Sequence, residues 1–323
     1  MTVIEGLGWA YVAATLLWLA LRVFWFDAHW LLALLNDGAL YLFTPLPLFL
    51  TYAIWQQKYA LLLALGAPSA AFLILFGARF LPRAPLRLEP TRARYLVMSF
   101  NMHYANWNLD AFAQTTRQFA PVLVGLQEVS APNRAFIETA LADMYPYRVY
   151  QPIRERHAVA LLSRYPLSRV EFLSPGLERG LRAIAQLPDS QSTVIVAHLA
   201  PPNMLNYPLN QFTTLARSRL TRRRAESVLL RQLGAFESNP AILLCDGNMS
   251  ATSRTYQIIA TSWRDSFAER GWGLGHTLKF FSPVPLQRYD YIWHNDRWRV
   301  SKFHIARDSG SDHLPVLATL YES

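Results

Sequence analysis

The sequence predicts an α/β domain that is preceded by a helical membrane region. Two observations predict the α/β domain. Short apolar runs rich in Val, Ile and Leu recur between residues 95 and 323, and amphipathic segments alternate with them in the first half of that range. Buried strands and the helices that cover them produce this alternation. The third observation is that long apolar runs fill residues 1–80, which predicts the membrane region.

The apolar runs of the first 80 residues are long enough to cross a bilayer. They lie near residues 4–22, 38–55 and 59–78, and a spanning helix needs about 20 apolar residues. The alternative is a secretory signal peptide, but that has a basic start and one run of about 7–15 residues, whereas this chain begins Met-Thr-Val-Ile-Glu5. Pro45 and Pro47 would kink the middle run, which leaves a re-entrant or broken helix open. We therefore predict about three transmembrane helices.

The placement of arginines predicts the side on which the following domain lies. With three spans, one side carries only Lys58 close to the membrane, and the other carries Arg22 and five arginines between residues 79 and 94. Cytoplasmic flanks are enriched in Lys and Arg, so we expect a multi-pass cell-membrane protein with its domain in the cytoplasm. The same arginines would also bind anionic headgroups, and charge alone does not separate the two interpretations.

Residues 81–94 are expected to be a linker between residues 1–80 and a domain at residues 95–323. Pro82, Pro85 and Pro90 predict that the linker is extended. The domain keeps a net charge of +6, because residues 1–94 hold only 7 of the 31 cations and 4 of the 22 anions. The excess indicates a phosphate-bearing partner, nucleic acid or anionic lipid, unless it is a generic basic surface.

Periodicity predicts the elements of this domain. Helices are expected at Leu109–Phe119 and Asn133–Met144, and strands at Ala158–Ser163, Ala183–Leu187, Thr193–Ala197, Ala241–Cys245 and Asp290–His294. A further helix is expected over residues 217–233, after an irregular loop over residues 201–212. This helix would carry Arg219, Arg222 and Arg223 near its start, either on a solvated face or as a clamp for a substrate or headgroup.

Six short polar islands end apolar runs in the domain. They read Val-Met-Ser-Phe-Asn101, Val-Gly-Leu-Gln-Glu128, Val-Ile-Val-Ala-His198, Leu-Leu-Cys-Asp246-Gly-Asn248, Tyr-Asp290-Tyr-Ile and Ser-Asp312-His313-Leu-Pro-Val. Each island supplies a side chain that can bind a metal or move a proton. Buried strands deliver such side chains to one edge of a sheet, so the islands predict one active site built from several strand ends.

In type and order, these six islands resemble the endonuclease/exonuclease/phosphatase superfamily, the deoxyribonuclease-I-like metal-dependent phosphoesterases. That family has an early Asn, a Gln-Glu, a His-bearing strand, a Gly-Asp-x-Asn, an Asp-Tyr-Ile and a Ser-Asp-His-x-Pro. The one departure is Cys245, where the family usually has Gly. The resemblance covers roughly 220 residues and implies a four-layer α/β sandwich, in which two packed mixed sheets are flanked by helices.

The resemblance also implies a metal site. It makes Glu128 the principal ligand of magnesium or manganese, with Asn101 beside it and Asp312 in support. Oxygen donors of this kind suit these hard cations. A zinc site is not expected, because Cys and His do not pair at ligand spacing.

Five further residues receive catalytic roles from the same resemblance. Asp246 is implied as general base, and Asn248 as a hydrogen-bond donor to the phosphate. Asp290 would orient His313 and favour its charged form, and His198 would donate to a nonbridging oxygen in the transition state. Whether Asp246 or His313 accepts the proton stays open.

The predicted function is that of a membrane-anchored metal-dependent phosphoesterase, which hydrolyses a phosphodiester or phosphomonoester with an activated water. A lipid headgroup is the leading substrate, and a membrane-tethered nuclease is the alternative. A catalytically inactive, membrane-anchored binding module is a third interpretation, which the intact residue set disfavours. One fold serves many substrates, so the resemblance does not choose among them.

Overall fold

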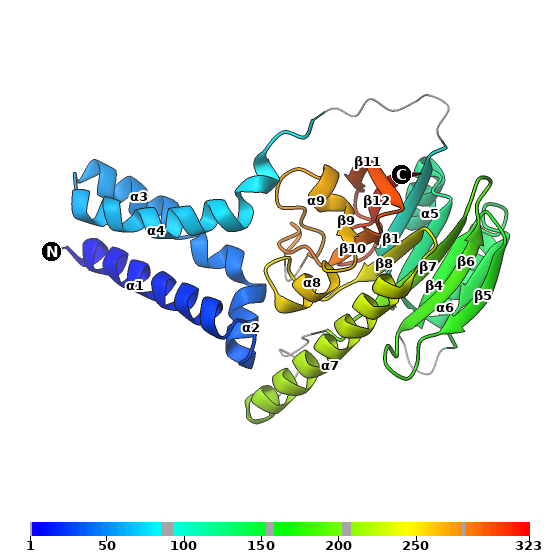
Figure 1. Ribbon diagram of the computed structural model, residues 1–323, viewed down its shortest axis with the longest axis horizontal. Coiled ribbons are helices and arrows are strands. Elements are labelled where there is room, and N and C mark those ends of the chain that lie inside the picture. Colours follow the sequence, from blue (N-terminus) through cyan, green and yellow to red (C-terminus); the bar gives the residue numbers. More distant parts are fainter. Residues whose placement is uncertain (1, 85–92, 153–157, 202–207, 280–281) are drawn as a thin grey trace. The chain divides into compact units, whose positions relative to one another are not determined.

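The computed structural model describes residues 2–84, 93–152, 158–201, 208–279 and 282–323 (Figure 1). The chain forms two compact units. The first comprises Met1–Leu81 together with Ser250–Arg254, and the second comprises Pro82–Met249 and Thr255–Ser323. Most of the predicted linker, residues 85–92, lies outside the described residues.

The first unit is helical. Its elements are α1 (Val3–Phe24), α2 (Trp30–Asp37), the 3-10 helix η1 (Ala39–Phe43), α3 (Leu46–Trp55), α4 (Tyr59–Phe76) and the 3-10 helix η2 (Gly77–Phe80). Two stretches, Val3–Phe24 and Tyr59–Phe80, are long and apolar enough to cross a membrane. They leave large apolar side chains uncovered, such as Leu63 and Ile74 at 83% and 81% exposure. Water disfavours such a surface, whereas hydrocarbon does not.

The middle apolar run is interrupted. Trp30–Asp37 and Ala39–Trp55 would make a third span only if the pair, which is bent by 70°, crosses the membrane as one element. The 70° bend lies at Gly38, between these two segments. Pro45 precedes α3 and Pro47 lies in its first turn, so the prolines mark the change from the 3-10 helix η1 to α3 and not the bend. With its 10 residues, α3 is about 15 Å long, which is too short to span the bilayer alone.

Polar side chains lie where this break occurs. The Asn36 side chain is buried, accepts a hydrogen bond from Trp18 Nε1 at 3.0 Å and donates to Asp27 Oδ1 at 2.6 Å. The short segment Ser250–Arg254 belongs to the same unit, and the N–H of Ser250 donates to Asp37 Oδ1 at 3.1 Å. A buried amide needs such partners in an apolar unit.

The second unit contains two mixed sheets of six strands each. The first sheet has the order β11 (Trp298–Ile305), β12 (Val316–Glu322), β1 (Tyr95–Asn101), β2 (Leu123–Val129), β4 (Ala158–Ser163) and β3 (Tyr147–Tyr150). The second has the order β5 (Leu167–Phe172), β6 (Gly180–Gln186), β7 (Gln191–His198), β8 (Ala241–Asp246), β10 (Asp290–His294) and β9 (Arg264–Asp265). Each sheet pairs two strands in parallel, β1 with β2 and β7 with β8, and its other pairs are antiparallel.

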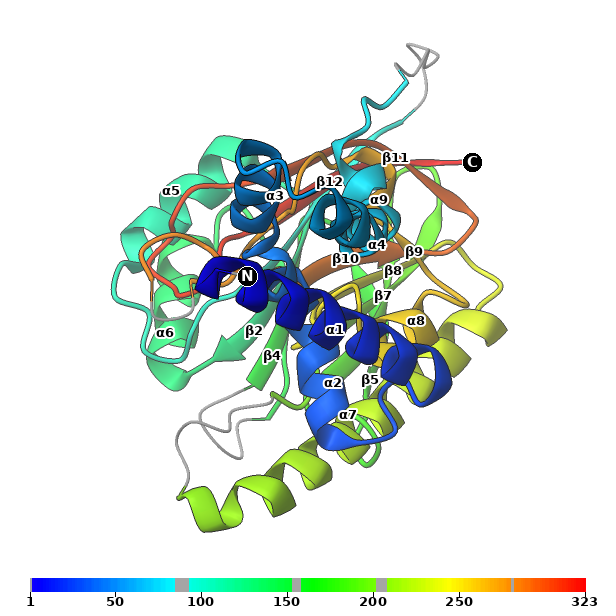
Figure 2. The same cartoon turned by 90° about the vertical axis from the view of Figure 1, so that its left-hand side faces the viewer.

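The two sheets pack face to face with helices outside them, as predicted (Figures 1 and 2). Val97 and Leu123 of the first sheet share a buried cluster with Val196 and Leu244 of the second. The sheets approach closely at Gly125, because a Cβ there would lie 2.6 Å from the Cβ of Leu244. The helices α5 (Leu109–Phe119) and α6 (Ala131–Ala140) cover the first sheet, and α7 (Leu209–Phe236) and α8 (Arg254–Ile259) cover the second. The short helix α9 (Ser266–Arg270) follows β9.

Several predicted boundaries need correction. The helix expected at Asn133–Met144 is α6, which starts earlier because the Ser130 hydroxyl caps its first turn and which ends at Ala140. The end of the predicted loop, residues 209–212, belongs to α7, since neither Pro nor Gly interrupts the chain between Pro208 and Gly234. Arg219, Arg222 and Arg223 therefore lie inside α7 rather than near its start. The rest of that loop, residues 202–207, lies outside the described residues.

Candidate active site

Strand register brings three of the predicted site residues into one row. In the second sheet His198 lies opposite Asp246, and Asp246 lies opposite Asp290. β7 and β8 run parallel, so both deliver their last residue to the same edge. In the first sheet the same arrangement pairs Asn101, the last residue of β1, with Gln127 of β2.

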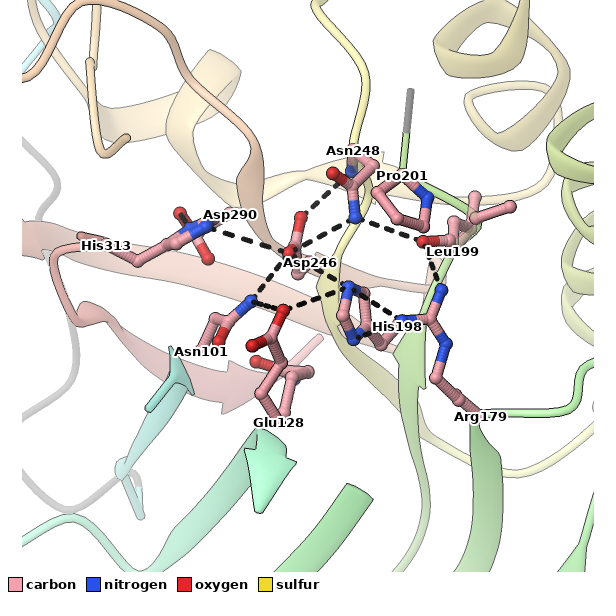
Figure 3. Close-up of polar contacts among 12 residues, drawn as sticks. Asn101, Glu128, Arg179, His198, Leu199, Pro201, Asp246, Asn248, Asp290 and His313 are labelled. Atoms are coloured by element: carbon pink, nitrogen blue, oxygen red, sulfur yellow. Dashed lines mark hydrogen bonds and ion pairs between the residues drawn. The ribbon is translucent and has the colours of Figure 1, made fainter. Parts of the chain in front are cut away.

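Asn101 joins the two sheets at this edge (Figure 3). Its Nδ2 donates to Asp246 Oδ2 at 2.9 Å and to Glu128 Oε1 at 3.4 Å. The Oδ1 of Asn101 accepts from the N–H of His103 at 2.9 Å, which fixes the side chain. Residues from both sheets thus converge on one cluster.

Glu128 is turned into the cluster by an irregularity of β2. Its φ is 54°, in the left-handed region that favours glycine, and the pairing of β2 with β4 shifts register between Leu126 and Val129. The N–H of Tyr104 lies 3.4 Å from Glu128 Oε2. Strained backbone of this kind is held by its surroundings and is common at functional sites.

His313 forms an ion pair with Asp290. The Nδ1 of His313 lies 2.8 Å from Asp290 Oδ2, and its Nε2 lies 3.9 Å from Asp246 Oδ2. Burial alone would lower the pKa of His313, but the carboxylates of Asp290 and Asp246 raise it to about 10. The ring is therefore an imidazolium at neutral pH.

Asp246 lies at the centre of the cluster and is buried. The pKa of Asp246 is raised to about 7, mainly by burial and also by the Asp290 carboxylate, although His313 and the hydrogen bond from Asn101 lower it. A carboxylate that titrates near neutrality is suited to accept a proton from water.

Asn248 is held in an unusual conformation two residues after Asp246. Its φ is 47°, its N–H donates to Asp246 Oδ1 at 2.9 Å, and its Nδ2 donates to Leu199 O at 3.0 Å. The carbonyl of Asn248 accepts a hydrogen bond from the guanidinium of Arg223, which is 2% exposed. Hydrogen bonds therefore hold both the side chain and the backbone of Asn248 in place.

His198 faces the cluster on one side and an arginine on the other. Its Nε2 lies 3.4 Å from Asp246 Oδ2 and 3.9 Å from Glu128 Oε1. The guanidinium of Arg179 contacts the ring at 3.1 Å from Nδ1 and donates to Leu199 O at 3.1 Å (Figure 3). Since a guanidinium only donates, a ring nitrogen of His198 is the acceptor.

Sequence reasoning missed Arg179 and the support that α7 gives. Glu226 of α7 accepts from the N–H of Ala200 at 2.7 Å, and Arg222 lies 3.0 Å from the other oxygen of Glu226. The signal for Arg223 was present, because it lies seven residues from the buried residues Ala216 and Leu230 and so shares their face. Its charge had argued for a solvated position instead.

Two sets of residues could hold a metal. Ligand atoms of Asp246, Asp290 and His313 lie within 4.8 Å of one another, and the buried Asp290 Oδ1 has no hydrogen-bond partner in the described part of the chain. A protonated His313, however, offers no lone pair to a cation. Glu128 and Asn101 provide oxygen donors at the same edge, which fits magnesium or manganese.

Asp312 is a predicted site residue whose carboxylate, within the described part of the chain, is hydrogen-bonded to its neighbour Ser311 and not to the cluster. It is half-buried, and its carboxylate accepts from the Ser311 hydroxyl at 3.3 Å. Ser311 also donates to the carbonyl of Asn101 at 2.8 Å, so the Ser-Asp-His segment is tied to β1. Among the described residues, no hydrogen bond links the Asp312 carboxylate to Glu128.

Residue 245 causes no break in β8. Cys245 is buried and lies in register between Ala197 and Tyr291, and the strand continues to Asp246. Burial raises the pKa of its thiol, which keeps it protonated. The substitution of Gly by Cys leaves the strand end intact.

Comparisons with known proteins agree with this geometry. Residues 98–313 match the model of the Endonuclease/Exonuclease/phosphatase family. The fold resembles a family protein from Bacteroides thetaiotaomicron, with 14% identity, coverage of 72% of this chain and 99% of the other, and a TM-score of 0.56. It also resembles a mannosyl-6-phosphatase from the same species, with 16% identity, coverage of 70% of this chain and 99% of the other, and a TM-score of 0.54. An AP endonuclease from Archaeoglobus fulgidus has 18% identity, coverage of 69% of this chain and 98% of the other, and a TM-score of 0.54. No curated protein sequence matches this chain.

Proposed function

Because this chain belongs to the Endonuclease/Exonuclease/phosphatase family, we propose that it is a membrane-anchored, metal-dependent phosphoesterase. Members of the family are hydrolases of the phosphoesterase and nuclease type. The observation that carries the proposal is the hydrogen bond from Asn101 to Asp246, which brings the residues of two sheets into one cluster of acids, amides and histidines. This set contains each part that hydrolysis of a phosphoester requires.

Glu128 and Asn101 would hold magnesium or manganese, with Asp312 in support from the adjoining segment. Their oxygen atoms are the donors that such cations prefer. A bound cation would neutralise charge on a nonbridging oxygen of the substrate phosphate.

The other residues act on water and phosphate. Asp246, with a pKa of about 7, takes a proton from the water that attacks phosphorus. The ester bond breaks as the new P–O bond forms, and the leaving oxygen departs as an alkoxide that takes a proton from solvent water. Asn248 and His198 donate to phosphate oxygens, and these donors stabilise charge in the transition state. The His313 imidazolium, fixed by Asp290, adds positive charge beside the same group.

A lipid headgroup is the leading substrate, and a nucleic acid is the alternative. Two apolar helices, or three if the bent pair is one span, support membrane anchoring. The positive flank at residues 79–94 supports a cytoplasmic domain. The structural relatives include a mannosyl-6-phosphatase and an AP endonuclease, so the fold alone is compatible with either chemistry.

The test is a metal-dependent activity screen of the full-length protein in detergent. Plasmid DNA, RNA and headgroup-labelled lipids are offered with magnesium, with manganese and with excess chelator. We expect hydrolysis only with metal, and Glu128→Ala should abolish it while the protein stays folded by circular dichroism. Full activity in chelator would contradict the metal assignment, and no activity on any substrate would favour an inactive binding module.

Anchoring and orientation need a separate measurement. A reporter fused after Ser323 should report the cytoplasm if three spans precede the domain. A signal from the opposite side would mean that the bent pair does not cross the membrane, or that the arginines bind headgroups instead of setting the orientation. Catalysis in detergent is independent of this result, so the two parts of the proposal are tested apart.

A further inference from the structure

Three arginines form a straight row on the surface of α7. Arg217, Arg224 and Arg231 are all exposed, and each is seven residues from the next. Seven residues make nearly two helical turns, so the three side chains leave α7 on one side, about 10 Å apart along its axis. The residues between Arg217 and Arg224 on the outer surface include Ser218 and Thr221, which are small and exposed.

The charge of this row is not neutralised within the described part of the chain. The helix contains one acidic residue, Glu226, which is buried and bound to Ala200 and Arg222. Among the described residues, none of the three row arginines forms an ion pair, whereas Arg222 and Arg223 are used internally. Arg222 and Arg223 are therefore not available for the clamp that the sequence suggested. In the part of the chain that the structure describes, the unpaired cations on the surface of α7 are the three arginines of the row.

We propose that the row Arg217–Arg224–Arg231 docks α7 on the anionic surface of a bilayer. A row of unpaired cations is complementary to lipid phosphates, each arginine contributing about a fivefold gain in association with an anionic surface. The chain supplies its own bilayer, since it carries helices able to span one. In Figures 1 and 2 the first half of α7 projects past the neighbouring strands. Arg217 belongs to this half, and its side chain is exposed.

Docking along this row would place the site close to the headgroups. Arg223 donates to the carbonyl of Asn248 in the site. Because successive helical residues are about 100° apart, the row lies roughly a quarter-turn around α7 from Arg223. A helix is about 10–12 Å wide with its side chains. The inference rests on membrane anchoring, not on the proposed hydrolysis, and it favours a substrate that lies in the bilayer surface.

The experiment uses the full chain in vesicles. A Thr221→Cys variant is labelled with a fluorophore, since Cys245 is fully buried. Quenching by lipids with a headgroup nitroxide is compared in phosphatidylcholine vesicles and in vesicles that also contain phosphatidylglycerol. We expect strong quenching in the anionic vesicles, weak quenching in the neutral ones, and loss of the difference in high salt.

Two triple variants separate the row from total charge. Arg217→Gln, Arg224→Gln and Arg231→Gln together should weaken docking by roughly 100-fold and remove the quenching. The control variant replaces three other exposed cations, Arg297, Lys302 and Arg307, by Gln. It loses the same number of charges and should leave the quenching unchanged. If the triple variant does not reconstitute, single substitutions should each weaken docking about fivefold.

The overturning results are specific. Equal quenching in neutral and anionic vesicles, or equal loss in the two triple variants, would refute a docking row. If the triple Gln variant of the row keeps the quenching but no longer binds DNA, the row binds nucleic acid instead. None of these readouts measures hydrolysis, so a failed activity screen leaves the inference testable.

Discussion

Replacing Arg223 by Met should reduce turnover without unfolding the protein. Arg223 is buried, and its guanidinium donates to the carbonyl of Asn248. Met keeps most of the apolar stem of the side chain and removes the guanidinium donor. Asn248, with a φ of 47°, then loses one of the contacts that hold its left-handed backbone.

The structure sets the size of this effect. A buried carbonyl that loses a charged donor costs about 1–3 kcal/mol, and the left-handed conformation costs about 1 kcal/mol or more. If 1–2 kcal/mol of this favours a displaced loop, the population of the productive loop falls roughly 5- to 30-fold. We expect kcat to fall by that factor with little change in KM. Complete loss of one transition-state donor, about 100-fold or more, is the upper bound.

The assay is hydrolysis of a soluble phosphodiester, bis(p-nitrophenyl) phosphate, by the full-length protein in detergent with magnesium. Arg224→Met is the matched control, because it makes the same chemical change one residue along at an exposed position. A double-mutant cycle with Asn248→Ala shows whether Arg223 acts through Asn248, in which case the two effects are not additive. Wild-type kcat in folded Arg223→Met, or additive effects in the cycle, would refute the reasoning.

Three other predictions follow from the site and the core. Activity should rise as pH increases through about 7, because Asp246 must be ionised to accept a proton, and it should fall near pH 10 as His313 loses its charge; a pH–rate profile of kcat checks both limbs. Asp290→Asn should move the alkaline limb to lower pH, because it removes the larger of the two carboxylate effects on His313, and an unmoved limb would argue that another group titrates there. Gly125→Val should destabilise the fold by about 1–3 kcal/mol through overlap with Leu244, seen as a lower thermal midpoint with the metal requirement unchanged.

The site was predictable from the sequence where side chain and strand end coincide. The edge at which His198 and Asp246 lie follows from apolar runs that stop at a polar residue, and the fold class follows from the same runs. For the predicted span at residues 38–55, the structure has its bend at Gly38, where the run begins, and not at Pro45 or Pro47. These predictions rested on local physics that a sequence displays.

Other features depend on contacts between distant residues. Arg179 reaches His198 from the turn just before the strand β6, and nothing in its local sequence indicates a partner. Residues 209–212, the first turn of α7, were predicted to belong to a loop because of nearby Pro and Asn, although no Pro or Gly lies inside this turn. The arginines of α7 divide into buried and exposed sets by their angle around the helix, which composition does not reveal.

The hydrogen bond from Asn101 to Asp246 spans 145 residues of sequence and joins the first sheet to the second. Contacts of such long range form late, because the chain must first lose the entropy of closing a large loop. Neither sheet alone contains a complete set of acids and donors, so an incompletely folded chain has no hydrolytic activity to release. The proposed activity therefore requires both sheets of the sandwich to be assembled. A chain cut between the two halves would keep this activity only if both fragments stayed associated.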